Sequence, residues 1–204
     1  MDPVEINAGS YYLRQLRADD LIDDRETLRA FGFADPDAHI AGRSAGWQAD
    51  TAYTWAIADP PTGTLLGEVG LASVDRATGH AEAICWVAVD QRGHGIAGTV
   101  LGSVLRFGFG ALDLRAVDYS HPPSDTAAAR VAEKLGWHPV EPAEAHRPTE
   151  THPTGARPVD TEPTGTRTDD APTGSVRTDG TRTAAALTDC ARTDGARQTW
   201  RATA

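Results

Sequence analysis

The feature that most constrains this sequence is a strand, a glycine-containing turn and a helix that follow one another between residues 82 and 112. The segment AEAICWVAVD is apolar and ends at Asp90, which indicates a buried strand. Apolar residues then recur at three-to-four spacing from Val100 to Leu112, which predicts a helix. Between them, Gly93 and Gly95 permit backbone conformations that are costly for other residues. Because a helix start offers unpaired N–H groups and the positive end of the dipole, we expect an anion site suited to a pyrophosphate.

This turn differs from two common phosphate-binding turns. No Gly-Lys-Ser/Thr follows, as in a Walker loop, and the third glycine of the dinucleotide fingerprint is missing. Read from Arg92 to Ala97 as RGHGIA, it resembles the Arg/Gln-x-x-Gly-x-Gly/Ala loop that binds acetyl-CoA in the GCN5-related N-acetyltransferase (GNAT) superfamily. A second segment, RVAEKLGW from Arg130 to Trp137, is similar to a helix end of the RimJ/RimL-type members, which acetylate protein N-termini and small amines. The resemblance extends over roughly residues 11–140.

Composition excludes several classes of protein. A chain of 204 residues with 40% hydrophobic residues can form one domain with its own core. No apolar run reaches the ~20 residues of a membrane span, and the first residues do not form a secretion signal. Two cysteines, Cys85 and Cys190, do not suggest a disulfide framework, so we expect a cytoplasmic protein. The net charge of −10 disfavours nucleic acid as a partner and would attract cationic amines, although many proteins are acidic for solubility alone.

Strand and helix patterns alternate through the first 140 residues and predict an α+β fold. We expect Asp19 and Asp20 to cap the first helix, and Asp35 with Pro36 to begin the second. The resemblance implies a mixed, mostly antiparallel sheet flanked by helices, in which the fifth strand runs parallel to the fourth. In that fold these two strands separate at their ends, and the pantetheine arm of the cofactor enters between them. The expected strands are residues 11–17, 53–58, 65–73, 81–89 and 114–119, and the expected helices are residues 21–31, 35–47, 97–111 and 124–135.

The composition changes at Glu141. From there to the C-terminus the chain repeats short units such as PTGAR and TDGTR, with few large apolar residues. Such a chain buries too little apolar surface to offset its ordering entropy, so we predict a GNAT-like domain of residues 1–140 followed by a disordered tail of residues 141–204. Family members normally continue with a β-hairpin that completes the sheet, and no such pair of strands is visible after Val140. We therefore expect an exposed fifth strand, covered by a partner chain in a homodimer or left open in an impaired enzyme.

The resemblance also implies which residues bind acetyl-CoA. Main-chain groups of Val87 and Val89 would pair with the pantetheine arm like an extra strand. Asp125 stands where the RimJ/RimL type has an asparagine that contacts the cofactor, and Ala128 replaces a serine near the sulfur. The alternative is that the glycines simply form a tight turn. The loop residues expected to bind the pyrophosphate are Arg92, Gly93, His94, Gly95, Ile96 and Ala97.

Acetyl transfer to an amine needs a group that accepts the amine proton. Glu68 and Glu82 are carboxylates within otherwise apolar strands, where an acid is costly unless solvated or partnered. Glu82 stands where many family members have a glutamate that relays a proton through water, so both are candidate bases; the alternative for each is a solvated edge residue. The leading hypothesis is an acetyl-CoA-dependent N-acetyltransferase acting on a protein N-terminus or a small-molecule amine, with no metal. The alternative is a catalytically impaired module of the same fold that binds acyl-CoA or a partner.

Overall fold

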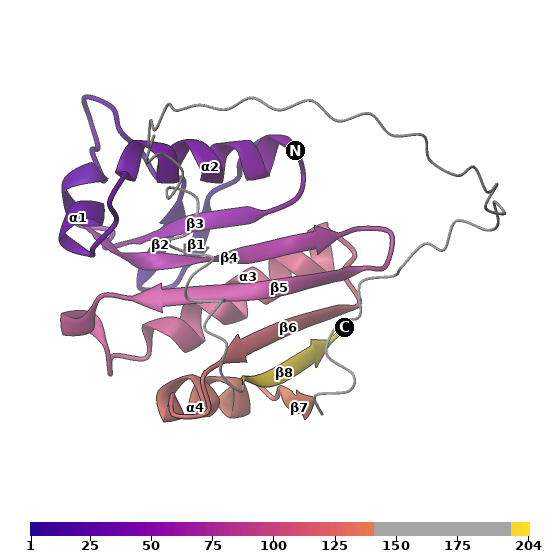
Figure 1. Cartoon of the computed structure of the whole chain (residues 1–204). Helices are drawn as coiled ribbons and strands as arrows, with labels where there is room; N and C mark the ends of the chain where they lie inside the picture. The colour runs from indigo at the N-terminus through magenta and orange to yellow at the C-terminus, as the bar shows by residue number, and fades with distance from the viewer. Residues whose placement is uncertain (141–196) are drawn as a thin grey trace, which may run out of the picture. The chain divides into compact units, whose positions relative to one another are not determined.

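A computed structural model describes residues 1–140 and 197–204 (Figure 1). The predicted α+β fold, a mostly antiparallel sheet flanked by helices, is confirmed. None of the helices in these residues is long and apolar enough to cross a membrane. In chain order the elements are β1 (Ile6–Ala8), β2 (Tyr11–Arg14), α1 (Arg25–Ala30), α2 (Pro36–Gln48), β3 (Tyr53–Ala58), β4 (Leu65–Asp75), β5 (His80–Val87), the 3-10 helix η1 (Val89–Gln91), α3 (Ile96–Ala111), β6 (Ala116–His121), α4 (Thr126–Lys134), β7 (His138–Val140) and β8 (Gln198–Thr203).

The strands of the described residues form one sheet in the order β1-β2-β3-β4-β5-β6-β8-β7. Every neighbouring pair is antiparallel except β5 and β6, which run parallel as the resemblance implies. All six residues of β3 are buried, which explains why its sequence YTWAIA is apolar on both faces apart from Thr54.

Helices cover both faces of the sheet. On one face, α3 packs Val100, Leu101 and Val104 against the strands within the larger apolar cluster. On the other face a second cluster joins Leu28 of α1 to Leu65 at the start of β4. Figure 1 presents this second face, with α3 behind β4 and β5. Side chains on any one strand therefore alternate between the α3 face and the α1–α2 face.

The helix caps agree with the sequence at α2 but not at α1. Asp35 accepts a hydrogen bond from the Ala38 N–H at 2.9 Å, with Pro36 in the first turn, as predicted. The prediction that Asp19 and Asp20 cap the first helix is wrong. Asp19 instead accepts from two backbone N–H groups of its own turn, a local pairing that competes with helix formation. Helix α1 consequently begins only at Arg25.

The last strand corrects the predicted tail. Strand β8 pairs antiparallel with β6 along its whole length and with β7 on its other side (Figure 1). Trp200 and Ala202 are buried while their neighbours are more exposed, so the segment QTWRAT alternates as a strand should. The prediction failed because six residues of strand pattern follow directly on the Thr, Asp, Gly and Arg repeats. The expected absence of a closing hairpin is therefore wrong.

The predicted domain boundary at residue 140 changes accordingly. Residues 197–204 belong with the sheet, and the repetitive segment connects two paired strands, because Val140 lies opposite Thr199. The prediction that the segment is disordered falls on residues 141–196, which lie outside the described residues. Since β8 covers β6, the argument for a partner chain at that edge no longer holds.

Candidate active site

The turn between η1 and α3 has the geometry of an anion site. Gly93 and Gly95 have φ values of +84° and +77°, in the left-handed region where a side chain costs free energy. A Cβ at either glycine would meet no atom within 4 Å, so backbone conformation, not space, requires glycine here. The backbone N–H groups of residues 93–98 have no acceptor among residues 1–140 and 197–204. Six unpaired donors at a helix start form a site for a phosphate group.

The side chains of this turn are placed differently from its backbone. Ile96 is buried in the larger apolar cluster, so it fixes the start of α3 against the sheet. Arg92 is exposed and its Nε donates to the Val87 carbonyl at 3.0 Å. His94 is also exposed, with Nδ1 3.1 Å from the Gln91 carbonyl oxygen. The guanidinium therefore lies along the end of β5, close to the place where the strands part.

Strands β5 and β6 stop pairing part-way along their length. The parallel register runs from His80 opposite Ala116 to Ala83 opposite Tyr119 and then ends. Figure 1 shows the two strands diverging beyond this point. The Ala88 N–H pairs with Leu66 of β4, so the main-chain groups of Val87 face the opposite side, toward β6. The end of β5 thus directs the Val87 N–H toward the opening between the strands, while the Val87 carbonyl accepts from Arg92 Nε.

Glu68 lies at the centre of a buried polar cluster. Its side chain is fully buried, with Oε1 2.6 Å from Arg43 Nε and Oε2 2.9 Å from His39 Nε2, both of α2. Trp86 Nε1 donates to the same carboxylate at 3.3 Å. Strand register places Glu68 directly beside Trp86 on the α1–α2 face. A carboxylate enclosed by two basic side chains and an indole stabilises the packing of α2 on the sheet and is not accessible as a base.

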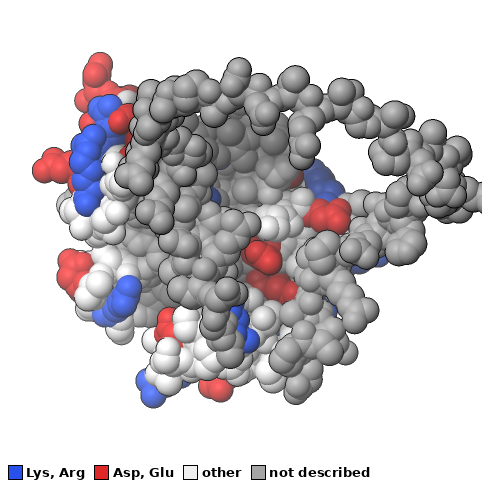
Figure 2. Space-filling view, in the orientation of Figure 1, with Lys and Arg blue, Asp and Glu red and all other residues white. Residues whose placement is uncertain are grey.

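Glu82 is exposed and lies on the same face, four residues before Trp86 in β5. Its carboxylate has no hydrogen bond or ion pair within the part of the chain that the structure describes. Figure 2 shows acidic side chains exposed in the middle of this face. Glu82 is one residue from Ala83, the last residue of β5 that pairs with β6. A solvated carboxylate therefore stands at the point where the strands separate.

A second polar cluster adjoins Glu82. Asp118 lies directly opposite Glu82 in β6, and Arg201 lies opposite Asp118 in β8. Arg201 holds both carboxylate oxygens of Asp118, at 2.7 and 2.9 Å, while His80 Nε2 lies 3.0 Å from Oδ2. Burial raises the pKa of Asp118, but its hydrogen bonds to Arg201 and His80 outweigh that effect and hold the pKa below its usual value. Asp118 is therefore a charged, fully paired carboxylate.

The thiol nearest the site is not a nucleophile. Burial, with a smaller effect of the Glu68 charge, raises the pKa of the Cys85 thiol to about 12. Since the thiolate is the reactive form, Cys85 is inert near neutral pH.

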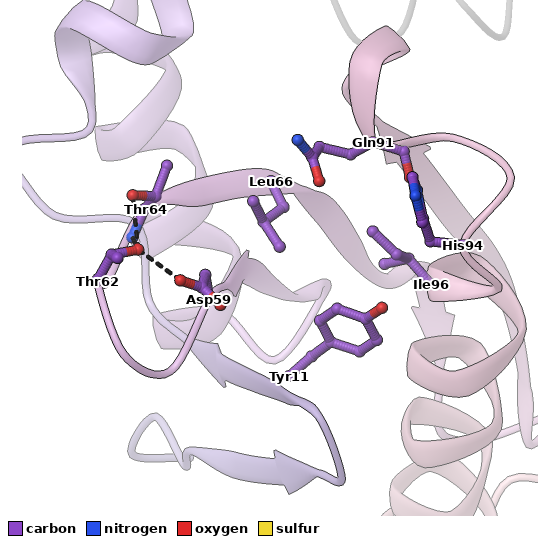
Figure 3. A pocket seen from close by; sticks show the side chains of 8 residues that line it. All are labelled: Tyr11, Asp59, Thr62, Thr64, Leu66, Gln91, His94 and Ile96. Carbon is purple, nitrogen blue, oxygen red and sulfur yellow. Dashed lines mark hydrogen bonds between the residues drawn. The ribbon is translucent and has the colours of Figure 1, made fainter.

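A pocket of about 370 Å³ borders the other side of the turn (Figure 3). Gln91 and His94 reach it from the turn, and Thr62 donates to Asp59 at 2.6 Å across from them. None of its lining residues belongs to β5 or β6, so it is separate from the opening between those strands. The lining residues are Tyr11, Asp59, Thr62, Thr64, Leu66, Gln91, His94 and Ile96.

Comparison with protein families identifies the family to which the chain belongs. A family model described as an acetyltransferase (GNAT) domain matches residues 11–138. The chain belongs to the GNAT family. It is thus an acyltransferase of a family that uses acetyl-CoA as co-substrate and transfers acetyl groups to amines.

Solved GNAT structures share the fold at low sequence identity. A candidate ribosomal-protein-serine acetyltransferase from Vibrio cholerae aligns with a TM-score of 0.59 and 19% identity, over 69% of this chain and 87% of its own. The ribosomal-protein-S5-alanine acetyltransferase from Vibrio fischeri gives 0.56 and 14%, over 67% and 84%. A dodecameric spermidine N-acetyltransferase from Vibrio cholerae gives 0.54 and 18%, over 65% and 81%. No curated protein matches the sequence.

Two positions depart from the expected GNAT pattern. Asp125, which replaces the cofactor-contacting asparagine, caps α4 by accepting from the Ala128 N–H at 3.0 Å. Ala128 itself is buried and offers no hydroxyl. Val89, expected to pair with pantetheine, uses its carbonyl to accept from the Arg92 N–H at 3.4 Å. Of the two valines, Val87 is the one whose strand geometry suits pairing with an extended ligand.

Sequence reasoning missed the partners around this GNAT site. Asp118 lies in the apolar segment AVDYS and could have been found by the argument that singled out Glu68, that a buried acid needs a partner. His39 and Arg43 carry a helical i, i+4 spacing, but nothing in the sequence directs them toward Glu68. Arg201 was out of reach, because its strand was assigned to the tail.

Proposed function

We propose that this protein transfers the acetyl group of acetyl-CoA to a primary amine, on a protein N-terminus or on a small molecule. The observation that carries the proposal is the set of N–H groups at residues 93–98 that have no acceptor among the described residues, in the turn that follows β5, the strand that stops pairing with β6 after Ala83. A ligand with a diphosphate at one end and an extended amide-containing arm at the other matches both features.

The chain's own residues would hold acetyl-CoA in three ways. The N–H groups between Gly93 and Ala97 would bind the pyrophosphate, with Arg92 and His94 beside them. The Val87 N–H would pair with an amide of the pantetheine arm, and Val89 would pack its exposed side chain alongside. Asp125 would contribute through the α4 cap, which fixes the start of that helix. The residues fit the ligand because the backbone N–H groups of residues 93–97 have no acceptor among the described residues, whereas Arg92 and His94 each contact a backbone carbonyl of the same segment.

We assign the base to Glu82 and not to Glu68. Glu82 is exposed and unpaired, whereas Glu68 is enclosed by Arg43 and His39. The Glu82 carboxylate would take the proton of the acceptor ammonium through a water molecule, and the free amine would attack the thioester carbonyl carbon. The C–N bond would form and the C–S bond would break, the nitrogen would release its second proton to solvent, and the coenzyme A thiolate would leave and take up a proton.

The class of acceptor follows from charge and from similar folds. The free Glu82 carboxylate and the net charge of −10 favour a cationic amine. The proteins of similar fold are described as acting on ribosomal proteins and on spermidine, which are both amine acceptors. These features support the proposal of a RimJ/RimL-type enzyme with an N-terminus or a small amine as acceptor.

One observation favours the alternative of an impaired acyl-CoA-binding module. Ala128 offers no hydroxyl near the expected position of the sulfur, and the Asp125 carboxylate is occupied by the α4 cap. The closing hairpin, however, is present as β7 and β8, so an open sheet no longer argues against turnover.

Thermal shift with acetyl-CoA, followed by thiol release with a panel of amines, tests the proposal. We expect acetyl-CoA to raise the melting temperature and amines to release thiol. Glu82→Gln should retain binding and lower kcat by about 10²–10⁴-fold, the usual contribution of a general base. Glu133→Gln, an exposed carboxylate of α4, is the matched control. Binding without amine-dependent thiol release would favour the impaired module, and no binding would refute both readings.

A further inference from the structure

Three charged side chains form one line across neighbouring strands. Glu82 of β5 is the register partner of Asp118 in β6, and Asp118 is the register partner of Arg201 in β8. Neighbouring strands lie about 4.8 Å apart, so side chains in such a line are within direct electrostatic reach. The charges along the line are therefore negative, negative and positive, with Asp118 in the middle.

The middle carboxylate is neutralised from one side. Arg201 donates hydrogen bonds to both carboxylate oxygens of Asp118. The Arg201 side chain is 28% exposed and the Asp118 side chain is 6% exposed. A bidentate pair of this kind is strong and geometrically fixed. Glu82, by contrast, is exposed and makes no such pair. The pairing leaves Glu82 as the carboxylate of this line whose charge is not balanced by a cation.

We propose that Arg201, a residue of strand β8, is a positioning residue of the transferase that cancels the Asp118 charge and thereby extends to lower pH the range in which Glu82 can accept a proton. The inference rests on the proposed role of Glu82. Without Arg201, Asp118 would stand as an uncompensated negative charge beside Glu82, and two neighbouring carboxylates favour protonation of one of them. Arg201 acts through Asp118 and does not touch the reacting atoms.

Two titratable side chains of β5 and β4, His80 and Asp75, adjoin the line. His80 shares the face of Glu82 and lies 3.0 Å from Asp118. Asp75, at the end of β4, is the register partner of His80, and its carboxylate accepts hydrogen bonds from the following turn. The β4 partner of Glu82 is Ala72, which carries no charge. The test must therefore include a variant of His80.

The test compares the pH dependence of kcat/KM in R201Q, D118N and the double variant. R201Q should move the acidic limb of the profile upward by about half to one pH unit, the effect of one added charge at this spacing. D118N removes the negative charge beside Glu82 and should move the limb downward. The double variant should return close to the wild type. R29Q removes an exposed arginine of α1 and is the control for a change of net charge.

A second readout separates this inference from the proposed function. The ¹³C chemical shift of the Glu82 carboxyl, followed over pH in the full-length protein, reports the same movements without any acetyl transfer. H80Q shows which part of the profile belongs to the imidazole. A wild type that acetylates no amine would refute the proposed function, yet opposite carboxyl shifts in R201Q and D118N would still support the coupling. If R201Q does not fold, the Glu82 carboxyl shift in D118N alone tests the inference. An unmoved Glu82 titration in the folded variants would overturn the inference.

Discussion

The hairpin of β7 and β8 predicts opposite effects for two deletions at the C-terminal end of the chain. In the first variant, a four-residue turn replaces residues 141–196 and leaves both strands in place. In the second, the chain ends at residue 196 and loses β8. If the repetitive segment adds no packed structure, only the second variant should lose stability.

The magnitudes follow from the contacts of each part. Closing a flexible loop costs about 0.6 kcal/mol for each doubling of its length, so a roughly fourteen-fold shortening should stabilise the domain by about 2 kcal/mol. Loss of β8 removes Trp200, which is 7% exposed, and burial of a tryptophan is worth about 3–5 kcal/mol. It also leaves Asp118 buried without Arg201. Together these losses approach the whole stability of about 5–15 kcal/mol of a typical domain.

Urea unfolding followed by tryptophan fluorescence measures both variants against the wild type. We expect the midpoint to rise for the shortened loop and the folded baseline to disappear or shrink for the truncation. A third variant with the sequence of residues 141–196 scrambled is the control, and its midpoint should match the wild type. If the shortened loop destabilises the protein as much as the truncation does, the segment contributes packing and the composition argument is refuted.

Three further predictions concern single side chains. Glu68→Ala removes the carboxylate that the partly buried Arg43 and His39 share and should cost about 3 kcal/mol in urea unfolding, with Glu133→Ala close to neutral. Gly95→Ala forces a side chain into the left-handed region and should cost about 1–2 kcal/mol and weaken acetyl-CoA binding in calorimetry, whereas Gly110→Ala in open space should not. Because the folded pKa of Asp118 is lowered, its stabilisation is present above the unfolded value of 3.8 and is lost as the pH falls through the folded value. Acid titration of D118N should therefore lose that part of the pH dependence, and an unchanged acid midpoint would contradict it.

The sequence predicts best where a single local signal decides the structure. Strand β3 has the expected bounds of residues 53–58 because its residues are apolar apart from Thr54. Helix α3 begins at Ile96, next to the expected position, because the glycine turn and the apolar spacing agree. The cap at Asp35 follows from the same kind of evidence. In each case the residues that decide the element lie within about one helical turn or one strand length of each other.

Contacts between distant segments are where the sequence fails. Trp200 donates a hydrogen bond to His121, which lies 79 residues away in the sequence, and no local sequence pattern predicts that pair. The six residues of β8 look like the repeats before them until β6 is placed alongside. For the two glutamates, the free-energy cost of burying a carboxylate predicts that an acid within a strand contacts either water or a partner side chain. It does not predict which of the two applies to a given glutamate. Glu68 pairs with side chains of α2, and Glu82 is exposed to solvent.

Strand β8 therefore has two physical roles that experiments must separate. Trp200 fills the core while Arg201, the next residue, faces the opposite side and pairs with Asp118. Alternation along one strand thus joins sheet stability to the charge balance beside Glu82. A truncation removes both effects at once, so loss of activity in that variant would say nothing about Arg201. Only substitutions that keep Trp200 buried and change the charge of Arg201 or Asp118 can show whether the closing strand tunes the base.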